Sequence, residues 1–244
     1  MQTWTIGIIC FNEKGTIQQV YEDVDKMLTG FGVDFEIILV DDASTDGSKE
    51  IIQSISAKDP LHVKAILHEY NQGIGSSIRD VYENATKENM VFVPGDGQFD
   101  VFELMPFKTF PANNYICFFR KENETYSMFR NLLSFLNKLF NQIFLGLNLK
   151  DVNWVKAYKR QAVQSFDLKM KSSVIESEIC AKLNQLNYTP QEVQSKYQQR
   201  VYGESQGASF RNMFRVAKEL LKLVLIIISF RFSKKRKELE IRKV

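Results

Sequence analysis

The sequence has few cysteines and little uninterrupted apolar length. Its three cysteines, Cys10, Cys117 and Cys180, are too few and too scattered for a disulfide scaffold or a structural zinc site. The apolar stretch 220–230 would make about 16 Å of helix, whereas the hydrocarbon core of a bilayer is roughly 30 Å thick. We therefore expect a protein of a reducing compartment, and this stretch is too short to span a membrane.

The chain also has little net charge, and that charge is unevenly placed. It carries 32 basic and 29 acidic residues, for a formal charge of +3. Residues 231–244 contain seven basic and two acidic side chains, so this end carries +5 and the remaining 230 residues sum to −2. Such a distribution argues against a domain that binds nucleic acid over its whole surface and indicates one locally basic end.

Common targeting and nucleotide-binding fingerprints are missing too. The apolar run 4–10 starts near Met1 without a preceding basic segment or a small-residue cleavage site, so we expect no signal peptide. No G-x-x-x-x-G-K-S/T loop occurs, and the first apolar run leads into Cys10-Phe11-Asn12-Glu13 rather than into a glycine fingerprint. A P-loop enzyme and a dinucleotide oxidoreductase are therefore disfavoured.

What the chain does have is the composition of a globular protein, with 44% hydrophobic and 25% charged residues and enough length for a large core. Short β-like runs alternate with helix-period segments over the first hundred residues. This alternation predicts an α/β fold, with helices covering the faces of a mostly parallel sheet. The expected strands are 3–10, 35–41, 63–68, 90–93 and 115–119.

Beyond residue 120 we expect helices over about 129–144, 173–186 and 210–232. The first of them is amphipathic, and its apolar face is expected to be buried. That face comprises Phe129, Leu132, Leu133, Leu136, Phe140, Ile143 and Phe144. Earlier in the chain, Asp100 and Glu103 lie three residues apart and predict a capping pair at the start of a further helix.

Three predicted strands end in segments rich in carboxylates or glycines. These segments are Asp41-Asp42-Ala43-Ser44-Thr45-Asp46-Gly47, Asn71-Gln72-Gly73-Ile74-Gly75 and Pro94-Gly95-Asp96-Gly97-Gln98. Each alone can be ordinary turn or N-cap chemistry. Ligands of open α/β sheets bind at the carboxyl ends of the strands, and a nucleotide diphosphate with a divalent cation needs carboxylates, small glycines and a neutral oxygen donor. Their joint placement therefore predicts such a site.

The ordered series of motifs resembles glycosyltransferase family 2, and within it the dolichyl- and polyprenyl-phosphate sugar synthases. The similarity spans about residues 3–225. It is carried by Ile9-Cys10-Phe11-Asn12-Glu13, the Asp41–Gly47 run, Asn71-x-Gly73-x-Gly75 with Arg79, Gly95-Asp96-Gly97-Gln98, Arg120, Arg130 with Ser134, Asp151-Val152-Asn153, Glu176-Ser177-Glu178, and Tyr197-Gln198-Gln199-Arg200 with Gly203 and Gly207.

The resemblance implies a GT-A fold, a Rossmann-like mixed sheet with helices on both faces, which binds a UDP- or GDP-linked sugar and transfers it with inversion. Donor contacts are implied for Phe11, Glu13, Asp42, Gly73 and Arg79. Mg²⁺ or Mn²⁺ would be held by Asp96 and Gln98. Catalytic roles are implied for Asp96, Arg120, Arg130 and Arg200, and the three arginines would meet phosphates of donor and acceptor. An acceptor-side or supporting role falls to Ser134, Asp151 and Glu178.

One position departs from the family pattern. The family usually has two aspartates flanking one residue, and Pro94 stands where the first is expected. Proline cannot ligate a metal, so Asp96 and Gln98 remain. Mg²⁺ tolerates this set because it retains waters and takes oxygens from substrate phosphates. We expect weak metal binding without donor, and the loss leaves open a domain that binds a nucleotide-sugar without turning it over.

The acceptor decides whether a general base is needed. A sugar hydroxyl needs one within hydrogen-bond reach, whereas a lipid phosphate is already anionic. His62 and His68 flank the third predicted strand and are expected to be structural, which leaves Asp151, Glu176 and Glu178 as candidate bases. A polyprenyl phosphate is the expected acceptor, and a hydroxyl of a lipid-linked or cell-surface glycan is the alternative.

The C-terminal segment bears on the acceptor as well. In the helix predicted from residue 210, basic residues lie opposite an apolar face that includes Leu221, Leu225 and Ile228. Followed by the basic tail, this is the pattern of a helix in an anionic membrane surface. The alternative is a final core helix. We expect a transferase domain at 1–209 and a membrane-contacting extension at 210–244, on the cytoplasmic face of the membrane and without a nucleic-acid partner.

Overall fold

The computed structural model describes residues 1–120, 128–200 and 210–242, with side chains at 1–120, 135–200 and 218–240. In these residues one mixed sheet has the strand order β3-β2-β1-β4-β6-β5-β7, and β6 runs antiparallel to both of its neighbours. The predicted α/β class is confirmed. The strands are β1 (Trp4–Cys10), β2 (Phe35–Asp41), β3 (Val63–Leu67), β4 (Asn89–Pro94), β5 (Asn114–Arg120), β6 (Lys156–Lys159) and β7 (Thr189–Ser195).

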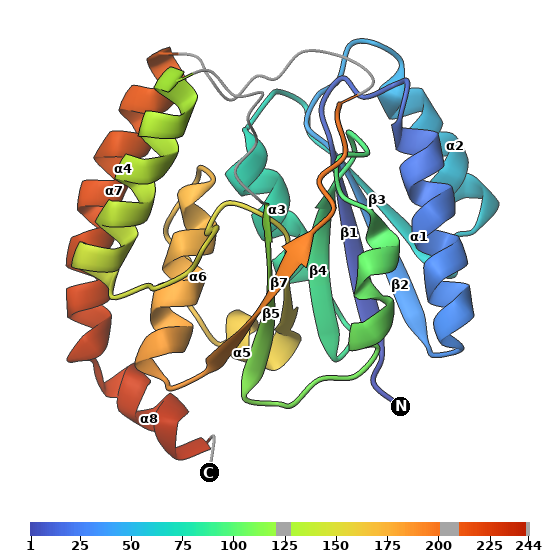
Figure 1. Ribbon diagram of the computed structural model, residues 1–244. Helices are drawn as coiled ribbons and strands as arrows, with labels where there is room; N and C mark the ends of the chain where they lie inside the picture. The colour runs from blue at the N-terminus through green and yellow to red at the C-terminus, as the bar shows by residue number, and fades with distance from the viewer. Residues whose placement is uncertain (121–127, 201–209, 243–244) are drawn as a thin grey trace.

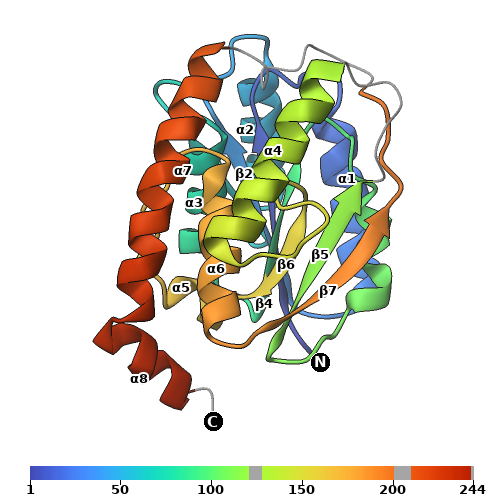
Figure 2. The same ribbon diagram turned by 60° about the vertical axis from the view of Figure 1, so that its left-hand side comes forward.

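Helices cover both faces of the sheet. α1 and α2 lie on one face, α3 and α6 lie on the other, and α4 and α7 form an outer layer beyond α6 (Figure 1, Figure 2). The helices are α1 (Ile17–Phe31), α2 (Ser48–Lys58), α3 (Ile74–Asn84), the 3₁₀ helix η1 (Val101–Phe107), α4 (Met128–Leu145), α5 (Arg160–Gln164), α6 (Val174–Gln185), α7 (Phe210–Arg231) and α8 (Lys234–Arg242).

Alternation along the central strands produces a core on each face of the sheet. Ile37 and Leu39 of β2 belong to the core beneath α1 and α2, whereas Ile38 and Val40 belong to the core beneath α3 and α6. Successive side chains of a strand point to opposite faces, so a strand covered on both faces is apolar at nearly every position. This is the pattern that predicts β1 and β2 from the sequence.

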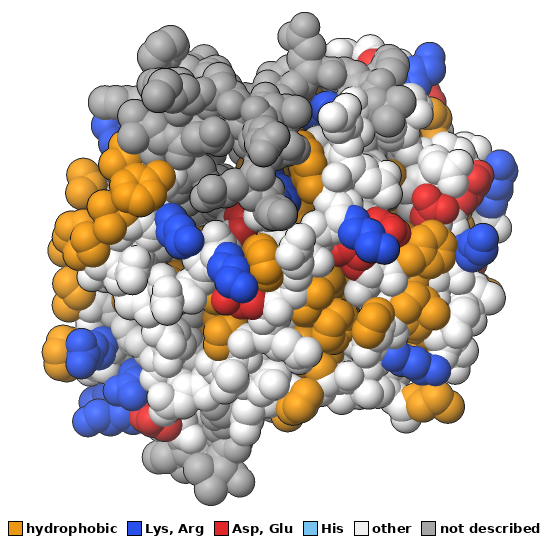
Figure 3. All heavy atoms as spheres, viewed as in Figure 1, with side chains coloured by type: hydrophobic (Ala, Val, Ile, Leu, Met, Phe, Trp, Pro, Cys, Tyr) orange, Lys and Arg blue, Asp and Glu red, His pale blue; other side chains and the backbone are white. Residues whose placement is uncertain are grey.

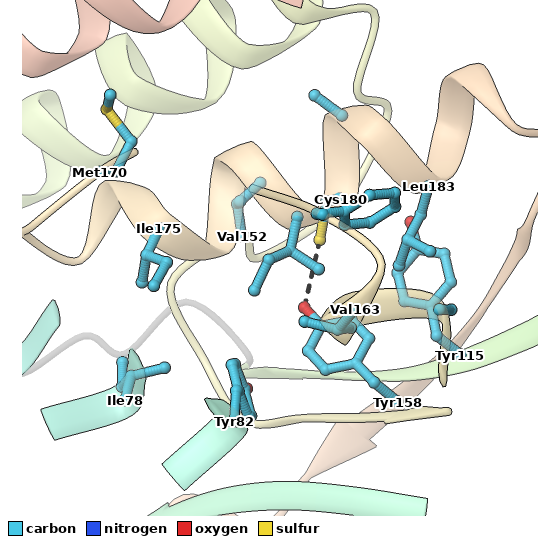
Figure 4. Close-up of a cluster of buried hydrophobic side chains, with 14 of the residues drawn as sticks. Ile78, Tyr82, Tyr115, Val152, Tyr158, Val163, Met170, Ile175, Cys180 and Leu183 are labelled. Carbon is cyan, nitrogen blue, oxygen red and sulfur yellow. Dashed lines mark hydrogen bonds between the residues drawn. The ribbon is translucent and has the colours of Figure 1, made fainter. Parts of the chain in front are cut away.

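The core beneath α6 has a polar centre. Figure 4 shows the Tyr158 hydroxyl directed at Cys180 Sγ, 3.5 Å away. The hydroxyl groups of Tyr82 and Tyr158 donate to the two carboxylate oxygens of Glu176 at 2.9 and 2.6 Å, and Lys156 Nζ lies 3.6 Å from the same carboxylate. A buried charge is tolerated when it is paired and hydrogen-bonded. Glu176 therefore supports the fold and is engaged as an acceptor.

The five predicted strands are confirmed to within one residue at each end, but β6 and β7 escaped prediction because neither has an apolar run. The predicted capping pair is confirmed for Asp100 and wrong for Glu103. Asp100 accepts from the Phe102 N–H at 3.0 Å, but it opens a 3₁₀ helix with Pro106 inside, and Glu103 accepts from the distant Lys196 N–H at 2.6 Å.

The predicted burial of the α4 apolar face is also wrong. Leu136, Ile143 and Phe144 are 49%, 64% and 55% exposed, while Asn141 is fully buried and donates to the Asn137 carbonyl at 2.7 Å. Because α4 belongs to the outer layer, its asparagine side meets the protein and most of its described apolar side faces outward, whereas Phe140 is half-buried and packs against the core as predicted. Phe129, Leu132 and Leu133 lie outside the residues whose side chains are described.

One face of α7 belongs to the core, as the alternative interpretation of the C-terminal helix expects, and the other face is exposed. Leu223, Ile227 and Phe230 are buried in the core beneath α6 and α7. Leu221, Leu225 and Ile228 are at least half exposed. None of the helices that the structure describes is long and apolar enough to cross a membrane.

The segment 169–173 connects α7 to the start of α3. Glu219 on α7 accepts from the Ser172 N–H and hydroxyl at 3.0 and 2.7 Å. The carbonyl oxygens of Lys171 and Ser172 lie against Gly75, where an added Cβ would come within 2.4 Å of each of them. α3 therefore begins in backbone-to-backbone contact with this segment, which only glycine permits.

We predict that Gly75→Ala destabilises the protein by about 1–3 kcal/mol, because the two carbonyl oxygens belong to backbone and cannot give way easily. Gly30→Ala is the matched control. Gly30 lies in α1 with nothing within 4 Å of an added Cβ, so alanine there should stabilise by up to about 1 kcal/mol. Urea unfolding measures both. Equal effects of the two variants would contradict the close approach at Gly75.

Candidate functional site

The carboxyl ends of β1, β2 and β4 meet at one edge of the sheet, as the sequence predicts. The pairing sets Cys10 opposite Asp41 and Ile9 opposite Pro94. The segments that follow these three strands therefore start at the same level. They contain Glu13, Asp42 and Asp96.

Hydrogen bonds tie the loop after β1 to the loop after β2. The Asn12 N–H donates to Ser44 Oγ at 2.9 Å, and the Thr45 N–H donates to Asn12 Oδ1 at 2.8 Å. The Glu13 N–H donates to Ser48 Oγ at 3.0 Å. Asn12 and Ala43 have positive φ angles of 59° and 61°, a strained conformation for alanine that concentrates at functional sites. The two loops thus form one unit.

Asp42 holds the loop after β3. Its carboxylate accepts from the N–H groups of Gln72 and Gly73 at 2.7 and 2.8 Å and receives a third bond from His68 at 2.7 Å. Gly73 has a φ of 90°, a value that glycine adopts without strain. The predicted donor residues Asp42 and Gly73 are therefore brought together.

Arg200 joins the other two carboxylates of this edge. Its guanidinium pairs with Glu13 and lies 3.5 Å from Asp96 Oδ2. Burial raises the pKa of Glu13 to about 7, against the opposing effect of Arg200. Burial also raises the pKa of Asp96, while the Gln98 N–H, Arg200 and Arg120 act in the opposite direction. The structure thus places one arginine between two carboxylates that are costly to keep charged.

The segment that carries Arg200 lies against the loop after β4. Gln98 Nε2 donates to the Tyr197 hydroxyl, and the Gln198 N–H donates to the Gln98 carbonyl at 3.0 Å. The amide oxygen of Gln98 is the atom that could ligate a cation. These contacts position Arg200 beside Asp96.

Arg120, at the end of β5, is held in place on two sides. Its Nε donates to Asp151 Oδ2 at 2.8 Å, and the guanidinium lies over the Trp154 ring, 4.5 Å from the centroid. A planar guanidinium that is fixed in this way has a defined orientation. The sequence analysis did not identify Trp154 as a site residue, because a single aromatic residue after Asp151-Val152-Asn153 forms no pattern of its own.

Arg79 and Glu178 lie elsewhere. Arg79 donates to the Met170 carbonyl, and the fully buried Glu178 accepts from the Lys169 and Met170 N–H groups and pairs with Lys182 at 2.6 Å. Both side chains hold the segment before α6, and their contacts do not connect them with Asp96.

The structure says less about the other residues that were predicted for the site. Phe11 is half-buried directly after β1. The side chains of Arg130 and Ser134 on α4 lie outside the described part of the chain, as do Gly203 and Gly207.

His68, which the sequence analysis assigned to structure, contacts Asp42 directly. The sequence could have identified His68 as a residue near the site, because it ends the third predicted strand and ligands bind at the carboxyl ends of strands.

A divalent cation fits this edge only together with a diphosphate. Among the described residues, no group of three or more histidine, cysteine, aspartate or glutamate side chains could hold a metal ion. Asp96 is the single carboxylate of its motif, and a guanidinium lies 3.5 Å from it. One carboxylate and one amide oxygen suffice for Mg²⁺ when substrate phosphates and waters complete the shell. The residues thus fit a cation that arrives with its ligand.

Comparison of the sequence with known proteins identifies a family and several relatives. The family model described as glycosyl transferase family 2 matches residues 5–155. An undecaprenyl-phosphate 4-deoxy-4-formamido-L-arabinose transferase of Pseudomonas paraeruginosa is 25% identical over 163 residues, which cover 66% of this chain and 48% of the relative. A protein of the same name from Pectobacterium carotovorum is 25% identical, with 66% and 50% covered. The chain thus spans about half the length of these curated relatives.

Solved structures show the same fold. Glucosyl-3-phosphoglycerate synthase from Mycobacterium tuberculosis, solved with Mn²⁺, UDP and phosphoglyceric acid, superposes with a TM-score of 0.62 at 16% identity, covering 93% of this chain and 78% of that one. S. aureus TarS in complex with UDP-GlcNAc gives a TM-score of 0.64 at 15% identity, with 96% and 68% covered. Because the family model matches more than half of the chain, the chain belongs to glycosyltransferase family 2, and its sheet and helices have the GT-A fold.

Proposed function

We propose that the protein transfers a sugar, with inversion, from a UDP-linked donor to a polyprenyl phosphate at the cytoplasmic face of a membrane. The observation that carries this proposal is Arg200, whose guanidinium lies between Glu13 and Asp96 at the strand ends. The names of the undecaprenyl-phosphate transferases support the acceptor class, and the UDP complexes of the structural neighbours support the donor class.

On the donor side, the chain supplies a place for a diphosphate leaving group. Asp96 and Gln98 would hold Mg²⁺ or Mn²⁺, which when bound supplies positive charge to the diphosphate as the bond to the sugar breaks. Arg200 is placed to donate to the same phosphates, since guanidinium groups bind phosphate oxygens in a fixed geometry. Glu13 keeps Arg200 at this edge. The loop 71–73, held by Asp42, forms the nucleoside side of the site.

On the acceptor side, the candidate general bases are already engaged. Asp151 pairs with Arg120, Glu176 accepts from two tyrosines in the core, and Glu178 pairs with Lys182. A hydroxyl acceptor would need a free base. A phosphate acceptor needs none, and Arg120 is positioned to bind its charge. The arrangement therefore favours a lipid phosphate over a hydroxyl.

A surface on the outer layer supports action at a membrane. We call it the α4–α7 surface, and Figure 3 shows its hydrophobic side chains gathered at the left edge, over α4 and α7. It consists of the exposed residues Phe135, Leu136, Leu139, Ile143, Phe144, Leu221, Leu225, Ile228 and Phe232. Large contiguous apolar patches on a protein surface mark interaction sites.

Basic side chains adjoin the α4–α7 surface. Exposed lysines occupy positions 218 and 222 on α7 and positions 234, 235 and 237 on α8. Apolar burial combined with cationic attraction is how amphipathic helices bind anionic lipid surfaces. The exposed side of α4, which the sequence analysis expected to be buried, thus gains a function in this proposal.

We predict that Asp96→Asn lowers kcat at least about a hundredfold, because charge stabilisation of the leaving group is lost. Asp100→Asn is the control on the same loop, since asparagine can still accept from the Phe102 N–H. Initial rates with polyprenyl phosphate, together with thermal melting, test both variants. Full activity of Asp96→Asn would overturn the assignment of the metal to this residue.

A panel of UDP- and GDP-sugars with polyprenyl phosphate and Mg²⁺ or Mn²⁺ separates an enzyme from a binding domain. We expect labelled lipid from a UDP-sugar, and only when donor, acceptor and metal are all present. Tight nucleotide-sugar binding that needs no metal and gives no product would identify a binding domain. Product formed on a hydroxyl acceptor instead would contradict the lipid-phosphate assignment.

The α4–α7 surface should govern binding to anionic liposomes. Charge reversal at Lys234, Lys235 and Lys237 should weaken co-sedimentation in a salt-sensitive way, because each basic residue near the surface contributes about 1 kcal/mol. Ile143→Ser with Phe144→Ser should weaken it at every salt concentration.

Leu61→Ser is the control for the apolar changes, since Leu61 is 89% exposed and lies in the chain between α2 and β3. In Figure 1, α2 lies on the opposite side of the molecule from α4 and α7. Deletion of α7 is not a suitable test, because Leu223, Ile227 and Phe230 belong to the core. A full-length protein that stays in the supernatant with anionic vesicles at low salt would overturn the membrane assignment.

A further inference from the structure

His68 connects the site edge to α3 through two carboxylates. Its Nδ1 lies 2.7 Å from Asp42 Oδ1, and its Nε2 lies 2.7 Å from Asp80 Oδ2. The imidazole is nearly buried, as is Asp42, whereas Asp80 on α3 is 30% exposed. The imidazole thus links the end of β2 to the middle of α3.

The geometry requires two N–H donors on one imidazole. A neutral imidazole has a single N–H and can serve only one of the two carboxylates, whereas the imidazolium ion serves both. Burial lowers the pKa of His68, but the hydrogen bonds to Asp42 and Asp80 outweigh this effect and raise the pKa above its ordinary value.

The other charged groups near His68 are engaged or directed elsewhere. The Asp41 carboxylate accepts from the Ser44 N–H at 3.1 Å, Arg79 donates to the Met170 carbonyl, and Glu69 is exposed. The imidazole therefore faces Asp42 from β2 and Asp80 from α3.

What His68 holds is the carboxylate that shapes the loop 71–73. Asp42 Oδ1 accepts from both His68 and the Gln72 N–H, and Oδ2 accepts from the Gly73 N–H. If the bond from His68 is lost, this carboxylate becomes free to turn, and the two amide bonds that define the loop weaken. His68 lies behind Asp42 in this chain of contacts, so it acts through Asp42.

We propose that His68 is a positioning residue for the donor, and that its protonated form locks Asp42 and the loop 71–73 in the conformation that binds the nucleoside. This inference rests on the proposed function, because it assigns the loop to a nucleotide-sugar. Donor affinity is then full at pH values below the point where His68 loses its proton. It falls as the pH rises through that point.

The experiment measures the Kd of UDP with Mg²⁺ from about pH 6 to about pH 9, across and above the ordinary range of histidine. His68→Gln should bind UDP about tenfold more weakly than the wild type at the low end, the effect expected for losing a charged hydrogen bond. The two curves should converge at the high end. Asp80→Asn should shift the loss of affinity to lower pH, since it removes one of the carboxylates that raise the pKa.

The control is His62→Gln, which changes the other histidine of the chain. His62 is exposed, pairs with Asp59 and lies before β3, so its variant should follow the wild-type curve. Amide hydrogen exchange without donor gives a second measurement. The Gln72 and Gly73 amides should exchange faster in His68→Gln and at the wild-type rate in His62→Gln.

Four outcomes would overturn the proposal. An unchanged Kd in His68→Gln would remove His68 from donor binding. Weakening by the same factor at every pH would leave His68 a merely structural residue whose proton has no role. If the wild type binds neither UDP nor GDP, the proposed function fails, and the donor role of His68 fails with it. Slower exchange of the Gln72 and Gly73 amides in His68→Gln than in the wild type would contradict the proposed lock.

Discussion

The pairing of β1 with β2 and β4 is the constraint on which the candidate site depends. The ladder continues one step beyond the strands, because the Asp42 N–H donates to the Cys10 carbonyl and the Gly95 N–H donates to the Ile9 carbonyl, each at 2.9 Å. A shift of one residue would turn every side chain of a strand to the other face of the sheet. The register of β1 with β2 and with β4 therefore fixes where Asp42 and Asp96 emerge.

The guanidinium groups of the site come from the half of the sheet that contains β5 and β7. Arg120 ends β5, and β7 pairs with β5 in parallel so that Arg120 lies opposite Ser195. The chain leaves β7 at the same edge and reaches Arg200 five residues later. The N-terminal strands thus supply carboxylates and the C-terminal strands supply guanidinium groups, and β6 joins the two halves.

The N-terminal half could be predicted from the sequence because strands covered on both faces are apolar throughout. β6 could not be predicted from the sequence. Its Lys156 is buried because Glu176 and two carbonyl groups satisfy its charge, and those partners are brought there by the fold. The motif resemblance singled out Glu13, Asp96 and Arg200, but their mutual contact depends on β7. For α4, periodicity predicted an amphipathic helix and could not tell which side meets solvent.

The contact at Gly75 has a mechanical consequence. Glu219 on α7 is bonded to Ser172, and the backbone of this segment touches Gly75 at the start of α3, two residues from the loop that Asp42 holds. The first step is a pair of hydrogen bonds to the Glu219 carboxylate, and the second is a backbone contact with no side chain between the two segments. Close-packed interiors transmit strain. A tilt of α7 larger than the Glu219 side chain can follow will therefore break its bonds to Ser172 or displace the first turn of α3.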